Sequence, residues 1–184
     1  KVASVLGAIG NNETGITGLN WELSILPLRI SFLDEYINAQ YYVKALRDKY
    51  NESNGAEGAF VVAINASLGF TDIPQALIDE VSNTYDELGS SGILNVGSVP
   101  NSNVNIDTDP DITSAESDYL IAVTNTSFTD IKTTNAAYGL QNCDLGAPGG
   151  DNIRPILTLD NFNTTADNTG GTSFASPLVA GTIA

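Results

Sequence analysis

Short apolar runs alternate with longer amphipathic segments along the first two-thirds of the chain. Four of the runs are almost continuously apolar, which is typical of strands buried on both faces, and they cover residues 23–30, 59–66, 92–97 and 119–124. The segments 33–50 and 73–88 carry apolar residues at three- and four-residue spacing and therefore predict amphipathic helices. A run of small apolar residues at 2–9 predicts the remainder of a buried helix, which Gly10 ends.

This alternation predicts an α/β fold of three layers, in which helices cover both faces of a mostly parallel sheet. Shorter β-like pieces follow at 143–147 and 153–159, before a final helical pattern. In such sheets, functional groups collect at the carboxyl ends of the strands. Because the chain begins at Lys1, has no methionine and stops at Ala184 inside a helical pattern, we expect residues 1–184 to be one domain, truncated at both ends.

Composition narrows the classes of partner. With 42% hydrophobic and 16% charged residues, the chain has the composition of a folded globular domain. Its 22 acidic residues outnumber 7 basic ones, giving a net charge of −15 that would repel nucleic acid and anionic membranes. No apolar run has transmembrane length. The single cysteine excludes a disulfide within the chain, and the absence of histidine excludes an imidazole base within it.

The most informative stretch is N-T-G-G-T-S-F-A-S-P-L-V-A-G at 168–181. Gly170 and Gly171 permit backbone angles that other residues resist, and the apolar spacing after them predicts a helix. Ser173 would lie near the positive end of that helix, beside unpaired backbone N–H groups that can stabilise an oxyanion. Spacing alone favours a plainer interpretation, in which Ser173 is an N-cap. Because Ala175 replaces the second glycine of G-x-S-x-G, an α/β-hydrolase nucleophile elbow is disfavoured.

The motif G-T-S-F-A-S-P, followed by V-A-G, resembles the nucleophile signature of the subtilase (subtilisin-like) serine peptidases. Other segments resemble further blocks of that family, in family order and across essentially the whole chain: K-V-A-S at 1–4, N-N-E-T-G-I-T-G at 11–18, I-N-A-S-L-G at 64–69, G-I-L-N-V-G-S-V-P-N at 92–101 and D-L-G-A-P-G at 144–149. The resemblance implies a subtilisin-like fold and peptide-bond hydrolysis.

The resemblance also implies roles for individual residues. Ser173 would be the nucleophile that forms an acyl-enzyme, and the Asn101 side chain would donate a hydrogen bond in the oxyanion hole. Five residues would contact the peptide: Ser67, Leu68 and Gly69 along its backbone, and Ser98 and Val99 in the primary specificity pocket. A wall of serine and valine suggests a pocket for uncharged side chains.

Two departures from the family pattern bear on activity. The oxyanion block usually reads A-G-N, whereas this chain has Val99, Pro100 and Asn101, and proline fixes its own φ and lacks an N–H. The segment 1–4 matches the tail of H-G-T-x-V-A-G, so the family pattern places the catalytic histidine three residues before Lys1 and the aspartate further upstream. We therefore expect this chain alone to be inactive.

Calcium is the one cofactor that the resemblance suggests, and the chemistry itself requires none. The loop at 11–16 resembles a calcium loop of the family, in which the Asn12 side chain would be a ligand. A second loop, 103–111, alternates asparagine and aspartate, but it lacks the glycine and terminal glutamate of an EF-hand, which favours a solvated acidic loop.

The sequence thus predicts part of a secreted serine endopeptidase domain, which acts on protein or peptide substrates and binds neither nucleic acid nor membranes. The alternative is a catalytically inactive subtilase-like module with a binding or structural role, suggested by Pro100 and the missing histidine. An unrelated acidic α/β cation-binding domain would require the order of the blocks to be coincidental.

Overall fold

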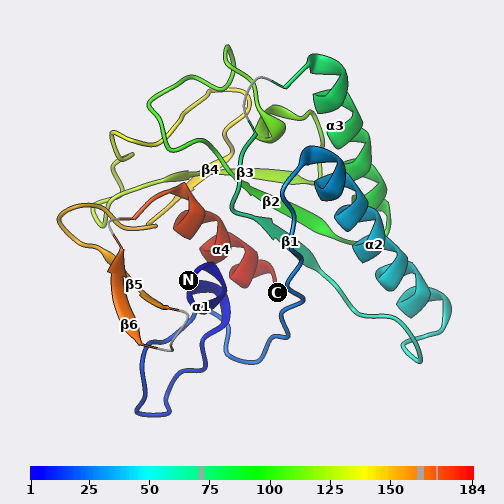
Figure 1. The fold of residues 1–184 in the computed structure, drawn as a ribbon, viewed down its shortest axis with the longest axis horizontal. Coiled ribbons are helices and arrows are strands. Elements are labelled where there is room, and N and C mark those ends of the chain that lie inside the picture. Colours follow the sequence, from blue (N-terminus) through cyan, green and yellow to red (C-terminus); the bar gives the residue numbers. More distant parts are fainter. Residues whose placement is uncertain (71–72, 161–163, 169) are drawn as a thin grey trace.

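The computed structural model describes residues 1–70, 73–160, 164–168 and 170–184. Its centre is a parallel four-stranded sheet in the order β1-β2-β3-β4, whose strands are Ala63–Ala66, Leu94–Ser98, Leu120–Asn125 and Leu145–Ala147 (Figure 1). Since neighbouring strands run in the same direction, their carboxyl ends meet at one edge of the sheet. The predicted α/β class with a parallel sheet is confirmed.

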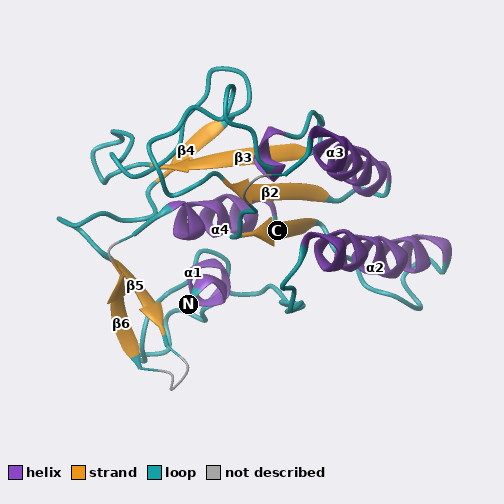
Figure 2. Cartoon of the chain, turned by 45° about the horizontal axis from the view of Figure 1, so that its top comes forward, coloured by secondary structure: helices purple, strands orange, loops and turns teal. Residues whose placement is uncertain are grey.

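Helices cover both faces of this sheet, as Figure 2 shows. On one face, α2 (Leu33–Glu52) and α3 (Gln75–Ser90) enclose the largest apolar core, which includes Ile78, Val81 and Leu88. On the other face, α4 (Thr172–Ile183) packs against the strands through a second core, and α1 (Val2–Gly7) contacts α4. The three predicted layers are therefore present, and α4 carries Ser173 directly against the sheet.

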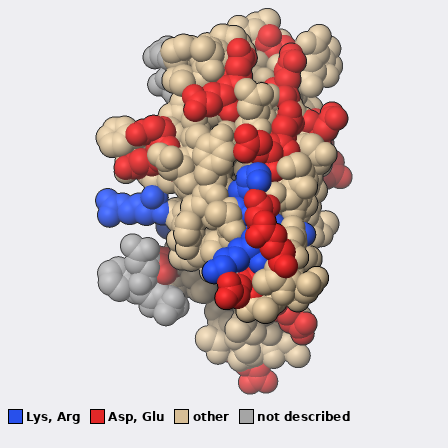
Figure 3. Space-filling model, turned by 90° about the vertical axis from the view of Figure 1, so that its right-hand side faces the viewer, with Lys and Arg blue, Asp and Glu red and all other residues tan. Residues whose placement is uncertain are grey.

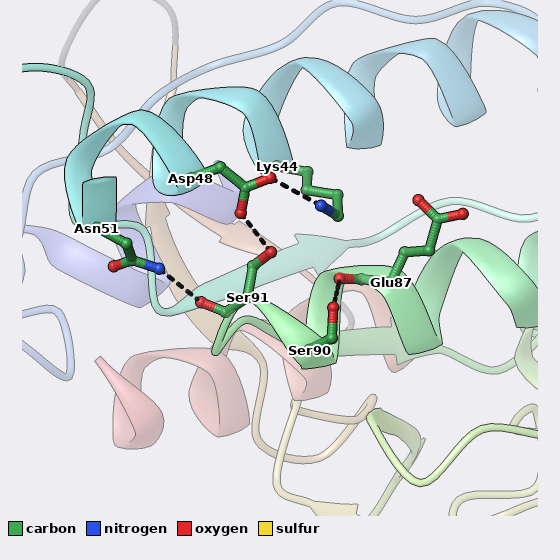
Figure 4. Close-up of polar contacts among 6 residues, drawn as sticks. All are labelled: Lys44, Asp48, Asn51, Glu87, Ser90 and Ser91. Atoms are coloured by element: carbon green, nitrogen blue, oxygen red, sulfur yellow. Dashed lines mark hydrogen bonds and ion pairs between the residues drawn. The ribbon is translucent and has the colours of Figure 1, made fainter. Parts of the chain in front are cut away.

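Polar contacts join the C-terminal ends of α2 and α3 (Figure 4). The Asp48 carboxylate accepts hydrogen bonds from Lys44 Nζ at 2.7 Å and from Ser91 Oγ at 2.5 Å. Asn51 Nδ2 donates to the Ser91 carbonyl at 3.4 Å. The hydrogen bond from Lys44 is the main reason why the pKa of Asp48 lies below its ordinary value.

Two smaller elements complete the described chain. The 3₁₀ helix η1 (Ile112–Ser114) lies between β2 and β3 in sequence and packs against both, while β5 (Ile156–Leu159) and β6 (Thr165–Asn168) form an antiparallel hairpin. The hairpin is tied to α1, because the Leu159 N–H donates to Ser4 Oγ at 2.9 Å.

The predicted strand at 23–30 is wrong, because this segment has no regular secondary structure. Its apolar side chains remain accessible, with Ile25, Leu26 and Leu28 exposed by 44%, 47% and 41%. A strand needs a neighbour for its backbone hydrogen bonds. None of the described strands pairs with this segment, and β1 is the edge of the described sheet. The strand β6 was not predicted, because T-A-D-N lacks the apolar residues that mark a strand.

Acidic side chains dominate the surface that carries α2 and α3, which Figure 3 views directly, with few basic groups among them. Within the described part of the chain, no helix is both long and apolar enough to cross a bilayer.

Candidate active site

Ser173 is the second residue of α4, so the interpretation of Ser173 as the N-cap is wrong. Gly171 is the N-cap, with φ 145° and ψ 167°, and Gly170 before it has φ 90°. Both conformations favour glycine, which explains the G-G pair. Ser173 is partly exposed, and neither its Oγ nor its backbone N–H has a hydrogen-bond partner among the described residues. Within the described part of the chain, Ser173 therefore has a hydroxyl and an N–H without partners at the positive end of a helix.

Asn101 is brought to the same helix end from 71 residues away in the sequence. Its Oδ1 accepts a hydrogen bond from the backbone N–H of Thr172 at 2.9 Å. This bond assigns the amide orientation, because an N–H must face the oxygen, and no described residue accepts a hydrogen bond from Asn101 Nδ2. A Cβ added at Gly171 would lie 2.8 Å from Asn101 Oδ1, so the second glycine also makes room for this contact.

Pro100 does not prevent this approach. The turn after β2 is held from both sides, because the Val99 N–H donates to the Val123 carbonyl at 3.1 Å and the Ala137 N–H donates to the Pro100 carbonyl at 2.9 Å. Proline keeps its acceptor, and the acceptor is the group used here. The departure from the A-G-N pattern is therefore compatible with an asparagine side chain at α4.

Ser67 binds the first turn of α4 to the end of β1. Pro177 lacks the N–H that would otherwise bond to the Ser173 carbonyl, and Ser67 Oγ donates to that carbonyl instead, at 2.9 Å. Because the hydroxyl has only one hydrogen, its 3.0 Å contact with Ser176 Oγ must be donated by Ser176. Asn65 Nδ2 also donates to Ser67 Oγ, at 2.9 Å. The Ser67 side chain is thus committed to positioning the nucleophile helix.

Asn125 supports the nucleophile from the end of β3, and sequence reasoning missed it. It is 2% exposed, and its Oδ1 accepts from the Gly149 N–H at 2.8 Å while its Nδ2 donates to the Gly150 carbonyl at 2.9 Å. The Gly149 carbonyl in turn accepts from the Gly171 N–H at 3.3 Å. The available signal was its position, because it directly follows the predicted strand 119–124, at the edge where functional groups collect.

The predicted peptide-binding residues differ in accessibility. Gly69 is exposed, and Ser67 and Leu68 are partly buried, whereas Ser98 and Val99 are only 4% and 1% exposed. Hydrogen bonds thus tie Ser67 to the Ser173 carbonyl and Asn101 to the adjacent residue Thr172. The contacts of these residues with a peptide stay a prediction.

The Asn12 loop is exposed over residues 11–15, and Asn12 Oδ1 accepts from the Thr14 N–H at 3.2 Å. No cluster of three or more histidine, cysteine, aspartate or glutamate side chains suited to a metal occurs within the described ranges. The calcium site at Asn12 therefore stays a prediction.

These residues fit the family to which the chain is matched. A model of the Subtilase family matches residues 1–184, so the chain belongs to the subtilase family. No match was found among curated proteins.

Three solved structures illustrate the likeness. A protease from Pseudoalteromonas arctica is 21% identical with a TM-score of 0.75, and the match covers 98% of this chain and 55% of that one. The nisin leader peptidase of Lactococcus lactis is 16% identical with a TM-score of 0.72, covering 98% and 59%. The epidermin leader peptide processing serine protease of Staphylococcus aureus is 16% identical with a TM-score of 0.68, covering 98% and 50%. The chain therefore spans about half the length of these structures.

Proposed function

We propose that these residues form the part of a serine endopeptidase domain that carries the nucleophile and the oxyanion hole. The observation that carries the proposal is the hydrogen bond from the Thr172 N–H to Asn101 Oδ1. It holds an asparagine amide beside the hydroxyl of Ser173, at the N-terminus of a helix. Family membership gives this geometry its chemical meaning.

In this mechanism, Ser173 Oγ attacks the carbonyl carbon of the scissile peptide bond as a base removes its proton. The oxygen becomes negative in the tetrahedral intermediate, where Asn101 Nδ2 and the Ser173 N–H donate to it. The C–N bond then breaks, the amine leaves with a proton, and water hydrolyses the acyl-enzyme. Since the chain contains no histidine, an imidazole base must come from outside these 184 residues.

The substrate would be a protein or peptide that binds in an extended conformation along Ser67, Leu68 and Gly69. The position of this segment supports the role, because it directly follows β1 and reaches α4 through Ser67. Exposure of Gly69 allows a peptide backbone to approach closely.

A fluorophosphonate probe, which phosphonylates activated serines, tests the proposal. We expect labelling of Ser173 in the full natural protein that contains these residues, loss of labelling in Ser173→Ala, and no change in Ser102→Ala, which alters an exposed serine next to Asn101. The isolated chain 1–184 should label negligibly. Failure to label the full protein would contradict a peptidase role, and strong labelling of the isolated chain would contradict the need for an external base.

The alternative is an inactive subtilase-like binding or structural module. The missing histidine and Pro100 motivate it, although the bonding of Asn101 to α4 removes the argument from Pro100. The identity of the residues before Lys1 would distinguish the peptidase from the inactive module. The sequence H-G-T there would favour the peptidase, and a glutamine or tyrosine at the histidine position would favour the module.

A further inference from the structure

Asp111 is a buried carboxylate with one oxygen in use and one left over. The residue is 6% exposed and caps η1, where its Oδ1 accepts from the Thr113 N–H at 2.7 Å and from Thr113 Oγ1 at 2.5 Å. Its Oδ2 is buried and has no hydrogen-bond partner among the described residues. A buried polar atom without a partner is uncommon in a native protein, and it needs a physical reason.

Capping does not supply that reason. A cap requires one acceptor oxygen, which an asparagine supplies as well as an aspartate. Neither of the ion pairs in the described part of the chain involves Asp111. Burial therefore raises the pKa of its carboxyl group, because water is excluded and no cation replaces it. The second oxygen and its charge serve no contact within the described fold.

The free oxygen lies beneath the predicted peptide-binding segment. A Cβ built at the exposed Gly69 would lie 3.8 Å from Asp111 Oδ2, and this is the only atom within 4 Å that belongs to a described residue outside its chain neighbours. A side chain at position 69 would therefore meet the carboxylate at van der Waals distance, and Gly69 leaves that space unfilled.

The helix η1, which Asp111 caps, packs against the end of β2. A Cβ added at Gly97 would lie 2.8 Å from the Thr113 methyl group, so η1 packs directly on the strand that leads to Ser98 and Val99. Asp111 thus lies beside Gly69 of the predicted peptide-binding segment, on a short helix that packs on the strand leading to the predicted pocket residues Ser98 and Val99.

We propose that Asp111 is the specificity-determining residue of the primary specificity pocket, and that this pocket accepts arginine or lysine. The inference rests on the proposed peptidase function and replaces the expectation of an uncharged side chain. A guanidinium or ammonium group that reaches Asp111 beside Gly69 donates a charge-assisted hydrogen bond to Oδ2, a buried acceptor that has no partner among the described residues. The net charge of −15 also favours a basic substrate, because it attracts positively charged peptides.

The test compares two peptidyl phosphonate probes that differ only in carrying arginine or leucine next to the phosphonate, applied to the full natural protein. The measured quantity is the second-order rate of Ser173 labelling. Wild type should prefer the arginine probe, and Asp111→Asn, which keeps the cap, should reduce the arginine-to-leucine ratio by at least about 10-fold. Asp109→Asn removes the same charge from an exposed position two residues away and should leave the ratio unchanged.

An unchanged ratio in Asp111→Asn would overturn the inference. Equal slowing with both probes would also overturn it, because that result would assign Asp111 a purely structural role. A simple fluorophosphonate without a peptide, used in parallel, separates the two proposals. If it labels Ser173 while the arginine preference is absent, only the pocket assignment fails; if it does not label Ser173, the peptidase proposal fails as well.

Discussion

Two polar sites lie near the carboxyl ends of the strands, and they differ in what their principal side chains bind. Around the nucleophile, Ser67, Asn101 and Asn125 use their side chains to hold α4 and the turns beside it. Beneath Gly69, Asp111 uses one oxygen for η1 and leaves the other without a described partner. The bonded side chains fix the geometry of the nucleophile helix, whereas Asp111 Oδ2, which lies beside the predicted peptide-binding segment, is where we propose that a substrate side chain completes the contact.

Asp48 shows that the difference is not a general property of aspartates in this fold. In Figure 4 its two oxygens face Lys44 and Ser91, and the pKa of its carboxyl group is lowered, chiefly by the hydrogen bond from Lys44. The pKa of Asp111 moves in the opposite direction because burial is not compensated. Asp48 thus forms a structural contact between two helices with both of its oxygens, whereas Asp111 keeps one oxygen without a described partner beside the predicted peptide-binding segment.

Removing a satisfied group should have the larger effect. Asn125→Ala takes away the acceptor of the Gly149 N–H and the donor to the Gly150 carbonyl. The Gly149 N–H would keep its second acceptor, the Ala147 carbonyl at 2.9 Å, but the Gly150 carbonyl would lose the Asn125 donor, so we expect the free energy of unfolding to fall by about 1–3 kcal/mol. The measurement is urea denaturation of the full natural protein, with Ser173→Ala in every sample to prevent self-cleavage.

Asn103→Ala is the matched control for this loss, because Asn103 is exposed and its Oδ1 accepts a single bond, from Lys132 Nζ at 3.2 Å. We expect it to change the unfolding free energy by less than about 0.5 kcal/mol. Equal losses in the two variants would contradict the bracing role of Asn125.

Removing the unsatisfied charge should have a smaller effect of opposite sign. A pKa that is higher in the folded than in the unfolded state means that the folded protein binds the proton more tightly, so ionisation of Asp111 costs stability. Asp111→Asn should therefore raise the unfolding free energy at pH 7 by on the order of 1 kcal/mol. The gain should develop as pH rises from the ordinary carboxyl pKa through the raised one, and vanish below it.

The check is the same denaturation series recorded from pH 3.5 to 8, with pH values chosen around the ordinary carboxyl pKa of about 3.9. Destabilisation by Asp111→Asn at pH 7 would show that the charge is part of the fold, and the contrast between the two sites would then disappear.

The helices and strands that could be predicted from the sequence are those whose pattern lies within the segment itself. The apolar runs that became β2 and β3 and the helical spacing that became α2 and α3 are local patterns, and the structure has them within a few residues. The run at 23–30 has an equally apolar pattern, yet no described strand pairs with it, so its residues form no strand. A strand is a property of two segments, and a single-segment pattern cannot supply the second.

In the candidate site, too, the local features could be predicted from the sequence and the contacts between distant residues could not. The G-G-T-S motif predicted a helix start at Ser173, because glycine conformation and helical spacing are local. The bond between Asn101 and Thr172 spans 71 residues, and family resemblance alone suggested the partnership. Asp111 stood out in sequence only as one acid in an alternating loop, since its burial depends on how η1 packs against β2.

The central claim, that Ser173 and Asn101 act on one carbonyl, is tested most directly by a crystal structure of the phosphonylated full protein. The account predicts a bond between phosphorus and Ser173 Oγ, with the phosphonyl oxygen about 2.7–3.1 Å from both Asn101 Nδ2 and the Ser173 backbone nitrogen. An adduct on another residue, or a phosphonyl oxygen directed into solvent away from Asn101, would contradict it.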